Sequence, residues 1–503
     1  MLSLRSQRSL RLASSFLLTL AIPGMSFAAG TSADVADAAQ KKDLTALRTL
    51  VQRKMDVNVS QPDGTTALHW AVTWNNEDAV SLLLRAGADA KARNRYGATP
   101  LSEAVTSGSA LMVESLLKAG ADAKTLTTED GETVLMTAAR AGNTDVVRLL
   151  LDRGADVNAR EKYKGQTALM WAAADHHPAT VKLLMERGAD WKVRSIDRET
   201  KVPRLSAASS ISPIARGGFT ALSFAGREGD IESARVMLDG GVDINYGDVD
   251  NTSALVVSIM NKQYTFAKYL IDRGADVNLA GSYGRTALYA IVDMRNEDYS
   301  ALPNRKGEDP LPSLDIVQAL LARGANVNLA LTANLPGRSG MDAGDTTLGA
   351  GTTPLMRAAR AGDAAVARLL LAKGADATLV TKDGNTALMF AAGVGYRDKN
   401  TRGLEKDALE TLKIFVDAGF DVRQANSRGE TALHGAADRG ADSLVQFLVD
   451  RGAEINVKSK AGFTPLDVAM GKSSFIQLPV PKPTTVTLLR KLGGIEAGTA
   501  IVK

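Results

Sequence analysis

The feature that most constrains this chain of 503 residues is a short phrase that recurs at a fixed period. The phrase is Gly, any residue, Thr, a small residue and Leu, as in GTTAL at 64–68. A second phrase follows each copy, as in VVRLLLDRG at 146–154, and in most copies its final glycine lies 21 residues after the threonine. The next threonine usually follows after 12 or 13 residues, so the repeat has 33 or 34 residues. A period of this length predicts a stack of similar pieces, each contacting only its neighbours.

The copies run through most of the chain. The phrase occurs at Gly64–Leu68, Gly97–Leu101, Gly131–Leu135, Gly165–Leu169, Gly218–Leu222, Gly284–Leu288, Gly351–Leu355, Gly384–Leu388, Gly429–Leu433 and Gly462–Leu466, with a degenerate copy at Asn251–Leu255. A degenerate first repeat, Asp34–Asn58, lacks the phrase but ends in the typical MDVN. We therefore expect about twelve repeats.

Each repeat has the signals of two consecutive helices. The threonine is a good helix N-cap, because its hydroxyl can accept from free backbone N–H groups of the first turn. Proline in the next position, as at Pro100, suits the first helical residue. The second run is apolar over a wide face, and the glycine that follows it, as at Gly154, tolerates the left-handed conformation that ends a helix.

The period, together with the TAL and GADVN phrases, resembles the ankyrin repeat family. The resemblance covers residues 34 to 494 and is specific, because two phrases recur in fixed register. It implies an all-α solenoid of about 12 helix-turn-helix repeats with β-hairpin-like connecting loops. In that family the loop tips and inner helices line a concave surface that contacts other proteins.

Four insertions interrupt the period. They are expected at 191–217 and 330–350, in the connecting loops, and at 296–312 and 396–405, between the two helices of one repeat. The predicted organisation is N-terminal repeats at 29–190, the insertion at 191–217, C-terminal repeats at 218–494 and a tail at 495–503. The first insertion is rich in arginine and lysine, which is typical of a neutral family-specific loop or of a finger that holds an acidic partner.

Residues 1–28 have the pattern of a secretory signal peptide. Three arginines precede a short apolar run at 12–22, and Ser26-Phe27-Ala28 is a small-x-small site, which predicts cleavage after Ala28. An uncleaved anchor is less well matched, because a spanning helix needs about 20 apolar residues. No later stretch could span a membrane. We expect an exported, bacterial member of the family, in the periplasm or outside the cell.

Composition excludes several kinds of chemistry. The chain has no cysteine, so disulfides, thiolate metal sites and thiol nucleophiles are excluded. The net charge of +4 falls to about +1 once residues 1–28 are removed, and a near-neutral chain gives no electrostatic case for nucleic acid. No catalytic, phosphate-binding or dinucleotide motif is visible. We expect no enzyme, no cofactor and no metal.

The four histidines and the recurrent aromatic residues have structural interpretations. His69 and His434 stand in the TALH phrase, which in ankyrin repeats satisfies loop backbone groups. His176 and His177 are adjacent in a loop, with no third ligand nearby. The aromatic residues at one fixed repeat position, Trp70, Trp171, Phe224 and Phe390, are expected to lie in the core.

The candidate contact residues lie on the loops, the inner helices and the first insertion. Aromatic residues and arginines are enriched in protein interfaces, although any one of these residues could be ordinary exposed variation. The candidates are Tyr96, Glu132, Arg140, Tyr163, Gln166, Arg194, Arg198, Arg204, Phe219, Arg227, Tyr283, Arg285, Arg360 and Asn385.

The favoured hypothesis is a non-enzymatic scaffold that binds another protein through this face and the insertion loops. Two alternatives stay open. One is a ligand- or metal-binding accessory to an exported enzyme, for which His176-His177 and the long loops are the only support. The other is an effector directed at host cells, by analogy with the family.

Overall fold

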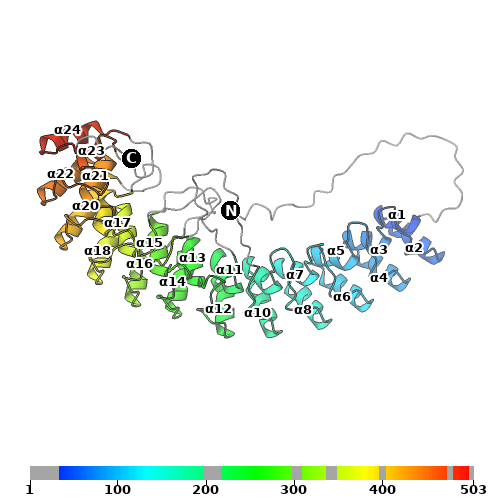
Figure 1. The fold of residues 1–503 in the computed structure, drawn as a ribbon. Coiled ribbons are helices and arrows are strands. Elements are labelled where there is room, and N and C mark those ends of the chain that lie inside the picture. Colours follow the sequence, from blue (N-terminus) through cyan, green and yellow to red (C-terminus); the bar gives the residue numbers. More distant parts are fainter. Residues whose placement is uncertain are drawn as a thin grey trace, which may run out of the picture. The chain divides into compact units, whose positions relative to one another are not determined.

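A computed structural model describes residues 33–196, 217–296, 309–335, 348–395, 404–472 and 480–497. These residues form 24 helices in about 12 consecutive pairs, which confirms the predicted repeat array (Figure 1). The chain divides into two compact units. The N-terminal unit contains residues 33–196 and 219–242, and the C-terminal unit contains residues 217–218 and the described residues from 243 onward.

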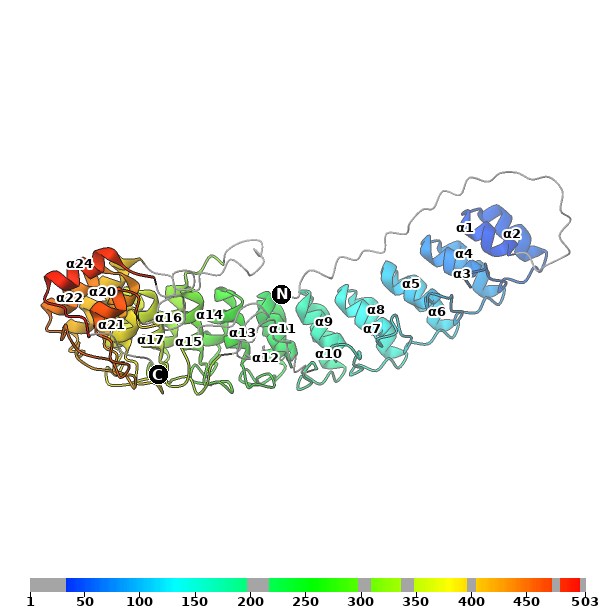
Figure 2. The same ribbon diagram turned by 45° about the horizontal axis from the view of Figure 1, so that its top comes forward.

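The N-terminal unit contains six helix pairs. Its first helices are α1 (Asp34–Gln40), α3 (Ala67–Thr73), α5 (Pro100–Ser107), α7 (Val134–Arg140), α9 (Ala168–Ala174) and α11 (Ala221–Glu228). Its second helices are α2 (Leu44–Gln52), α4 (Glu77–Arg85), α6 (Ala110–Lys118), α8 (Thr144–Asp152), α10 (Pro178–Glu186) and α12 (Ile231–Asp239). Each first helix contacts the first helix of the next pair, and the second helices do the same, so the unit has two layers (Figure 2).

The C-terminal unit repeats this arrangement. Its first helices are α13 (Ala254–Met260), α15 (Ala287–Arg295), α17 (Pro354–Ala361), α19 (Ala387–Ala392), α21 (Ala432–Arg439) and α23 (Pro465–Ala469). Its second helices are α14 (Tyr264–Asp272), α16 (Ser313–Ala322), α18 (Ala364–Ala372), α20 (Glu405–Asp417), α22 (Asp442–Asp450) and α24 (Pro483–Lys491). The core of both units lies between the layers and consists mostly of Ala, Val, Leu and Met.

The first helices begin where the sequence predicts. Thr99, Thr133 and Thr167 each precede a first helix in extended conformation, and their hydroxyls accept from backbone N–H groups three residues on, at 3.1, 3.2 and 3.4 Å. Each cap satisfies a helix donor that would otherwise lack a partner. Pro100 and Pro354 occupy the first helical position, as expected.

The second helices end at the predicted glycines. Gly154, for example, has a φ of +84°, a left-handed conformation that residues with a Cβ rarely adopt. The asparagine of the GADVN phrase then joins neighbouring pairs. Asn158 Nδ2 donates to Gly188 O at 3.2 Å, and its Oδ1 accepts from Asp190 N at 2.8 Å. The recurring phrase therefore supplies both a helix terminus and a link to the next repeat.

The connecting loops are tight turns tied to one another. Within the N-terminal unit, Arg95 N donates to Asp63 O at 2.9 Å and Lys162 N donates to Asp130 O at 2.6 Å. Over the described ranges the loops form only isolated bridges, Leu126 with Thr133 and Ala425 with Thr431, and no sheet. The connecting loops, which were expected to resemble β-hairpins, are therefore tight turns.

The predicted insertions interrupt the array between helices, but most of their residues lie outside the described part. This applies to 197–216, 297–308, 336–347 and 396–403, and also to the predicted signal peptide at 1–28. No helix among the described residues is long and apolar enough to cross a membrane.

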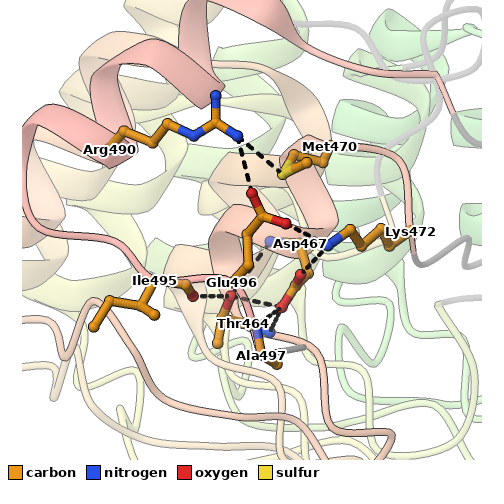
Figure 3. A network of polar contacts seen from close by, with 8 residues as sticks. All are labelled: Thr464, Asp467, Met470, Lys472, Arg490, Ile495, Glu496 and Ala497. Carbon is orange, nitrogen blue, oxygen red and sulfur yellow. Dashed lines mark hydrogen bonds and ion pairs between the residues drawn. The ribbon is translucent and has the colours of Figure 1, made fainter. Parts of the chain in front are cut away.

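The start of the predicted tail contacts the last helix pair (Figure 3). Asn456 Nδ2 donates to Gly493 O and its Oδ1 accepts from Ile495 N, which continues the asparagine link of earlier repeats. Glu496 accepts from Lys472 at 2.8 Å and from Arg490 at 2.9 Å. Residues 495–497 are therefore part of the folded end of the array, in register with the preceding loops.

Candidate protein-binding surface

Three positions of the repeat, best seen at α7, lie together on one side of the first helix. They are the residue before the cap, and the fourth and seventh residues after it. Around α7 these are Glu132, Thr137 and Arg140. Glu132 Oε1 lies 3.3 Å from Arg140 Nη2 and accepts from Thr137 Oγ1 at 3.1 Å. Residues three apart on a helix share a face. We call the surface formed by these positions along a unit the first-helix face.

Arg140 joins two neighbouring pairs on this face. Its guanidinium carbon lies 4.7 Å from the ring centroid of Trp171 on α9, which is a favourable cation–π distance. The Arg140 side chain is 44% exposed, so its charge still faces water. Trp171 is half-buried, and its buried indole N–H has no hydrogen-bond partner among the described residues. The pair thus presents an oriented cation over an aromatic ring.

The same combination recurs on α11. The Arg227 guanidinium carbon lies 4.8 Å from the ring centroid of Phe224, and Arg227 Nε donates to Glu228 at 2.8 Å. Phe219, the residue before the cap, packs edge-on against Phe224 with centroids 5.8 Å apart. Phe224 is buried, as predicted for its repeat position, whereas Phe219 and Arg227 are partly exposed.

Sequence reasoning missed an aromatic cluster at the start of the array. Trp70 and Trp74 on and after α3 are stacked with centroids 5.9 Å apart, and Lys42 Nζ lies 3.9 Å from the Trp74 centroid. Trp70 is only half-buried, and its indole N–H donates to Gln61 at 2.8 Å. The prediction that this repeat position lies in the core is therefore wrong for Trp70, and it is equally wrong for the half-buried Trp171, because both side chains lie on the first-helix face. For Trp70, the spacing of four residues from Trp74 was the available signal.

Burial perturbs one acid of the first-helix face. Glu103, the fourth residue after its cap on α5, is half-buried, and burial raises the pKa of its carboxyl above the ordinary value.

The predicted loop aromatics of the N-terminal unit stand out from the surface. Tyr96 is 71% exposed and Tyr163 is 50% exposed. Arg95 Nη2 donates to the Tyr96 hydroxyl at 3.0 Å, and Lys164 Nζ lies 5.8 Å from the Tyr163 centroid. These loops hold aromatic rings in water beside cations, a combination enriched at protein interfaces.

Three predicted contact residues are buried and do not form an outer surface. Arg360 is 4% exposed and donates to Val394 O at 2.7 Å and to Gly395 O. It is covered because the chain after α19 folds over it. Asn385 is 4% exposed and accepts from Asn426 at 2.8 Å. The third residue, Gln166, is 8% exposed. The prediction that these three residues contact a partner is therefore corrected, because their buried side chains stabilise neighbouring loops.

The remaining candidates are partly exposed or lie outside the described residues. Arg285 Nη1 lies 2.9 Å from Met260 Sδ, and Tyr283 O accepts from Thr332 N at 3.0 Å. Arg194 is partly exposed, and its carbonyl accepts from Arg160 at 2.7 Å. Arg198 and Arg204 fall in the part of the first insertion that is not described.

Two histidines have the predicted structural role. His434 Nδ1 accepts from Thr431 N at 3.1 Å, so the neutral ring donates through Nε2 to Phe463 O, also at 3.1 Å. His69 makes the equivalent bonds to Thr66 N and Ala98 O. Burial lowers the pKa of both imidazoles. Each histidine thus fastens a cap to the next loop.

The adjacent histidines have different surroundings. His177 Nε2 lies 2.9 Å from Arg140 O, at the end of α7. His176 Nδ1 lies 3.9 Å from Asp230 Oδ1. Among the described residues, no group of three or more His, Cys, Asp or Glu side chains could hold a metal ion.

Comparisons with known proteins agree with this repeat architecture. The family profile described as "Ankyrin repeats (3 copies)" matches residues 35–127, 112–195, 205–281, 222–330, 311–399 and 403–478. The human protein named Ankyrin repeat and SOCS box protein 16 is 29% identical over 249 residues, which are 50% of this chain and 47% of that protein. Mouse protein phosphatase 1 regulatory subunit 12A is 36% identical over 88 residues, which are 18% of this chain and 7% of that protein.

A solved structure of the human ASB11 ankyrin repeat domain is also similar. It has 24% sequence identity and a TM-score of 0.39, and the match covers 48% of this chain and 98% of that one. The matches span less than half the length of the curated relatives described above.

Proposed function

We propose, because this chain belongs to the ankyrin repeat family, that it is a scaffold that binds another protein and catalyses no reaction. Ankyrin repeats are generally protein–protein interaction modules. Fold membership alone gives no partner or site. The site in this proposal is the first-helix face of the N-terminal unit together with its loop tips.

The observation that carries the proposal is the repeated pairing of a cation with an aromatic ring in this unit. Such pairs occur on the first-helix face, as in Arg140 with Trp171, and on the loops, as in Arg95 with Tyr96. Aromatic rings and arginines supply much of the binding energy in protein interfaces, because they bury a large area and still make directed polar contacts. An interior role would have covered these rings, whereas Tyr96 and Tyr163 remain in water.

The first-helix face of the C-terminal unit supports the choice by contrast. There Arg357 Nε donates to Asp293 at 2.6 Å and its side chain is only 11% exposed. Arg360 is buried under Val394. The arginines of this stretch hold the array together, so they contribute little to a surface that a partner could contact.

Site-specific photo-crosslinking in cells that express the chain natively tests the proposal. A photoreactive residue replaces Tyr96 or Tyr163 in two variants, and Leu111 in the control. Leu111 is 60% exposed on α6, a second helix. We expect the same protein to be captured from positions 96 and 163 and not from 111. Capture from 111 alone, or from none of the three positions, contradicts the proposal.

The first insertion is the second part of the proposed contact. The segment 191–217 carries Arg194, Arg198 and Arg204, which suit an acidic partner. Replacing residues 197–216 with a short Gly-Ser linker should weaken capture from position 163. Unchanged capture would remove the insertion from the interface.

Export from a bacterial cell is a separate proposal, and residues 1–28 are its support. The arginines, the apolar run and the Ser26-Phe27-Ala28 site together form a complete secretory signal. The intact mass of the protein purified from native cells tests this. A chain that begins at Ala29 is expected, and one that retains residues 1–28 would contradict export through this signal.

A further inference from the structure

A pocket of about 240 Å³ lies between the loops of the last two repeats in the C-terminal unit. Ser427, Arg428 and Glu430 line one side, and Ser459 and Lys460 line the other. His434 and Val468 come from the adjoining first helices, so the pocket opens beside the first-helix face. No candidate from the sequence falls in it.

The pocket has a fixed backbone frame. Lys460 N donates to Arg428 O at 2.8 Å, which ties the two loops together. Ser427 N donates to Asp383 O at 2.8 Å and anchors the first loop to the preceding repeat. Ser459 Oγ accepts from Phe463 N at 3.3 Å. A ligand would thus meet walls that are already positioned, which lowers the entropic cost of binding.

The lining offers mainly hydrogen-bond donors. Lys460 is exposed, and the Ser427 and Ser459 hydroxyls can donate into the pocket. The acceptor in the lining, the Glu430 carboxylate, already accepts hydrogen bonds from the protein. The Glu430 side chain is 6% exposed, and its Oε2 accepts from Arg428 Nε at 3.1 Å and from Asn426 at 2.8 Å. A matching ligand must therefore bring acceptors.

The charges of the lining select the kind of acceptor. Arg428 and Lys460 are cations and Glu430 is an anion, so one positive charge remains uncompensated. His434 adds none, because its Nδ1 accepts a backbone N–H and the ring is neutral. A carboxylate carries one negative charge, whereas a phosphate group carries close to two at neutral pH. The balance therefore favours a carboxylate.

We propose that this pocket binds the carboxylate of an acidic side chain on a protein partner, held by Lys460 and the two serine hydroxyls. This inference rests on the proposed function and adds an anchor point in the C-terminal unit. The Arg428 guanidinium, whose side chain is 52% exposed, is kept in place by Glu430 and adds attraction from the rim.

Selection from a displayed library of random dodecapeptides on the full chain tests the proposal. We expect enriched peptides with a common Asp or Glu, and a peptide with that acid changed to its amide should bind about tenfold more weakly. Lys460→Glu should weaken the parent peptide by about tenfold or more, because it replaces attraction with repulsion. Lys460→Ala should have an intermediate effect.

Lys458→Glu is the matched control. Lys458 is exposed two residues away and does not line the pocket, so binding should be unchanged. Peptides without a shared acid, peptides held equally by Lys460→Glu and the wild type, or no enriched peptide would each overturn the proposal. Peptides that lose affinity with Arg140→Glu but not with Lys460→Glu would overturn the pocket and leave the proposed function standing.

Discussion

Asp248, which opens the loop before α13, is a buried acid whose ionised form should weaken the C-terminal unit. It is 7% exposed, and its Oδ1 accepts from Asp250 N at 2.9 Å and Thr252 N at 2.7 Å. Asn94 makes the same two bonds in the corresponding loop of another repeat, to Tyr96 N and Ala98 N at 3.0 Å each. Asparagine thus fills this role without a charge, and Asp248→Asn should preserve the loop.

The expected gain follows from the pKa of Asp248. Burial, as the main cause, raises this pKa from 3.8 to about 6, against the opposing effect of the two N–H bonds. The folded state therefore holds the proton more tightly than the unfolded chain, so stability falls as pH rises from about 4 to 6 and stays low above that. Each pKa unit is worth about 1.4 kcal/mol, which makes the ionised carboxylate cost about 3 kcal/mol at pH 7.

Urea unfolding at pH 4 and pH 7 measures this difference, with amide exchange in α13 as a local probe. Asp248→Asn should stabilise the C-terminal unit by about 3 kcal/mol at pH 7 and by little at pH 4. Asp243→Asn is the control, because Asp243 lies in the same unit and is exposed, while its carboxylate accepts from Asn245 N at 2.9 Å. An equal effect of Asp248→Asn at both pH values, or destabilisation at pH 7, would refute the reasoning.

Three further predictions test the structural roles of individual groups. Thr167→Ala should lower the free energy of unfolding by about 1 kcal/mol in urea titrations, while Thr167→Ser should restore the cap of α9. His434→Ala should lower the free energy of unfolding by about 2–4 kcal/mol, because two hydrogen bonds are lost and a cavity is left. Since burial lowers the His434 pKa, the wild type should lose stability as pH falls below 6.5, and the variant should lose less. Deleting residues 495–503 removes Glu496 from Lys472 and should speed amide exchange in α23 and α24 by about tenfold, whereas unchanged exchange would show that this end needs no clamp.

The repeat count and the helix boundaries could be predicted because they depend on local chemistry. A threonine cap, a proline after it and a glycine at the end act within one turn of helix. Thr99, Pro100 and Gly120 therefore predict the helix start and end from the sequence alone. The asparagine of the GADVN phrase was recognised only as a family mark. Its function as a link between repeats involves a partner about 30 residues away, which the phrase does not reveal.

The surface was harder to predict because exposure depends on what covers a residue. Arg140 and Arg360 hold the same position in their repeats, yet one is exposed and the other is under Val394. The difference lies in the chain after α19, where the carbonyls of Val394 and Gly395 accept from the Arg360 guanidinium and cover it. Trp70 and Trp171 were misplaced for the converse reason, since this repeat position stays partly exposed in both repeats, whereas Phe224 and Phe390 at the same position are buried. The residues that cover or expose such a side chain belong to neighbouring repeats, so the sequence of a single repeat does not show them.

The central claim is that the N-terminal unit binds its partner through the first helices and their loop tips. Hydrogen–deuterium exchange on the complex with the photo-captured protein tests this most directly. We predict protection in residues 127–140 and 160–174, which contain the loop tips with α7 and α9, and no change in α6, α8 and α10. Protection confined to those second helices would contradict the account.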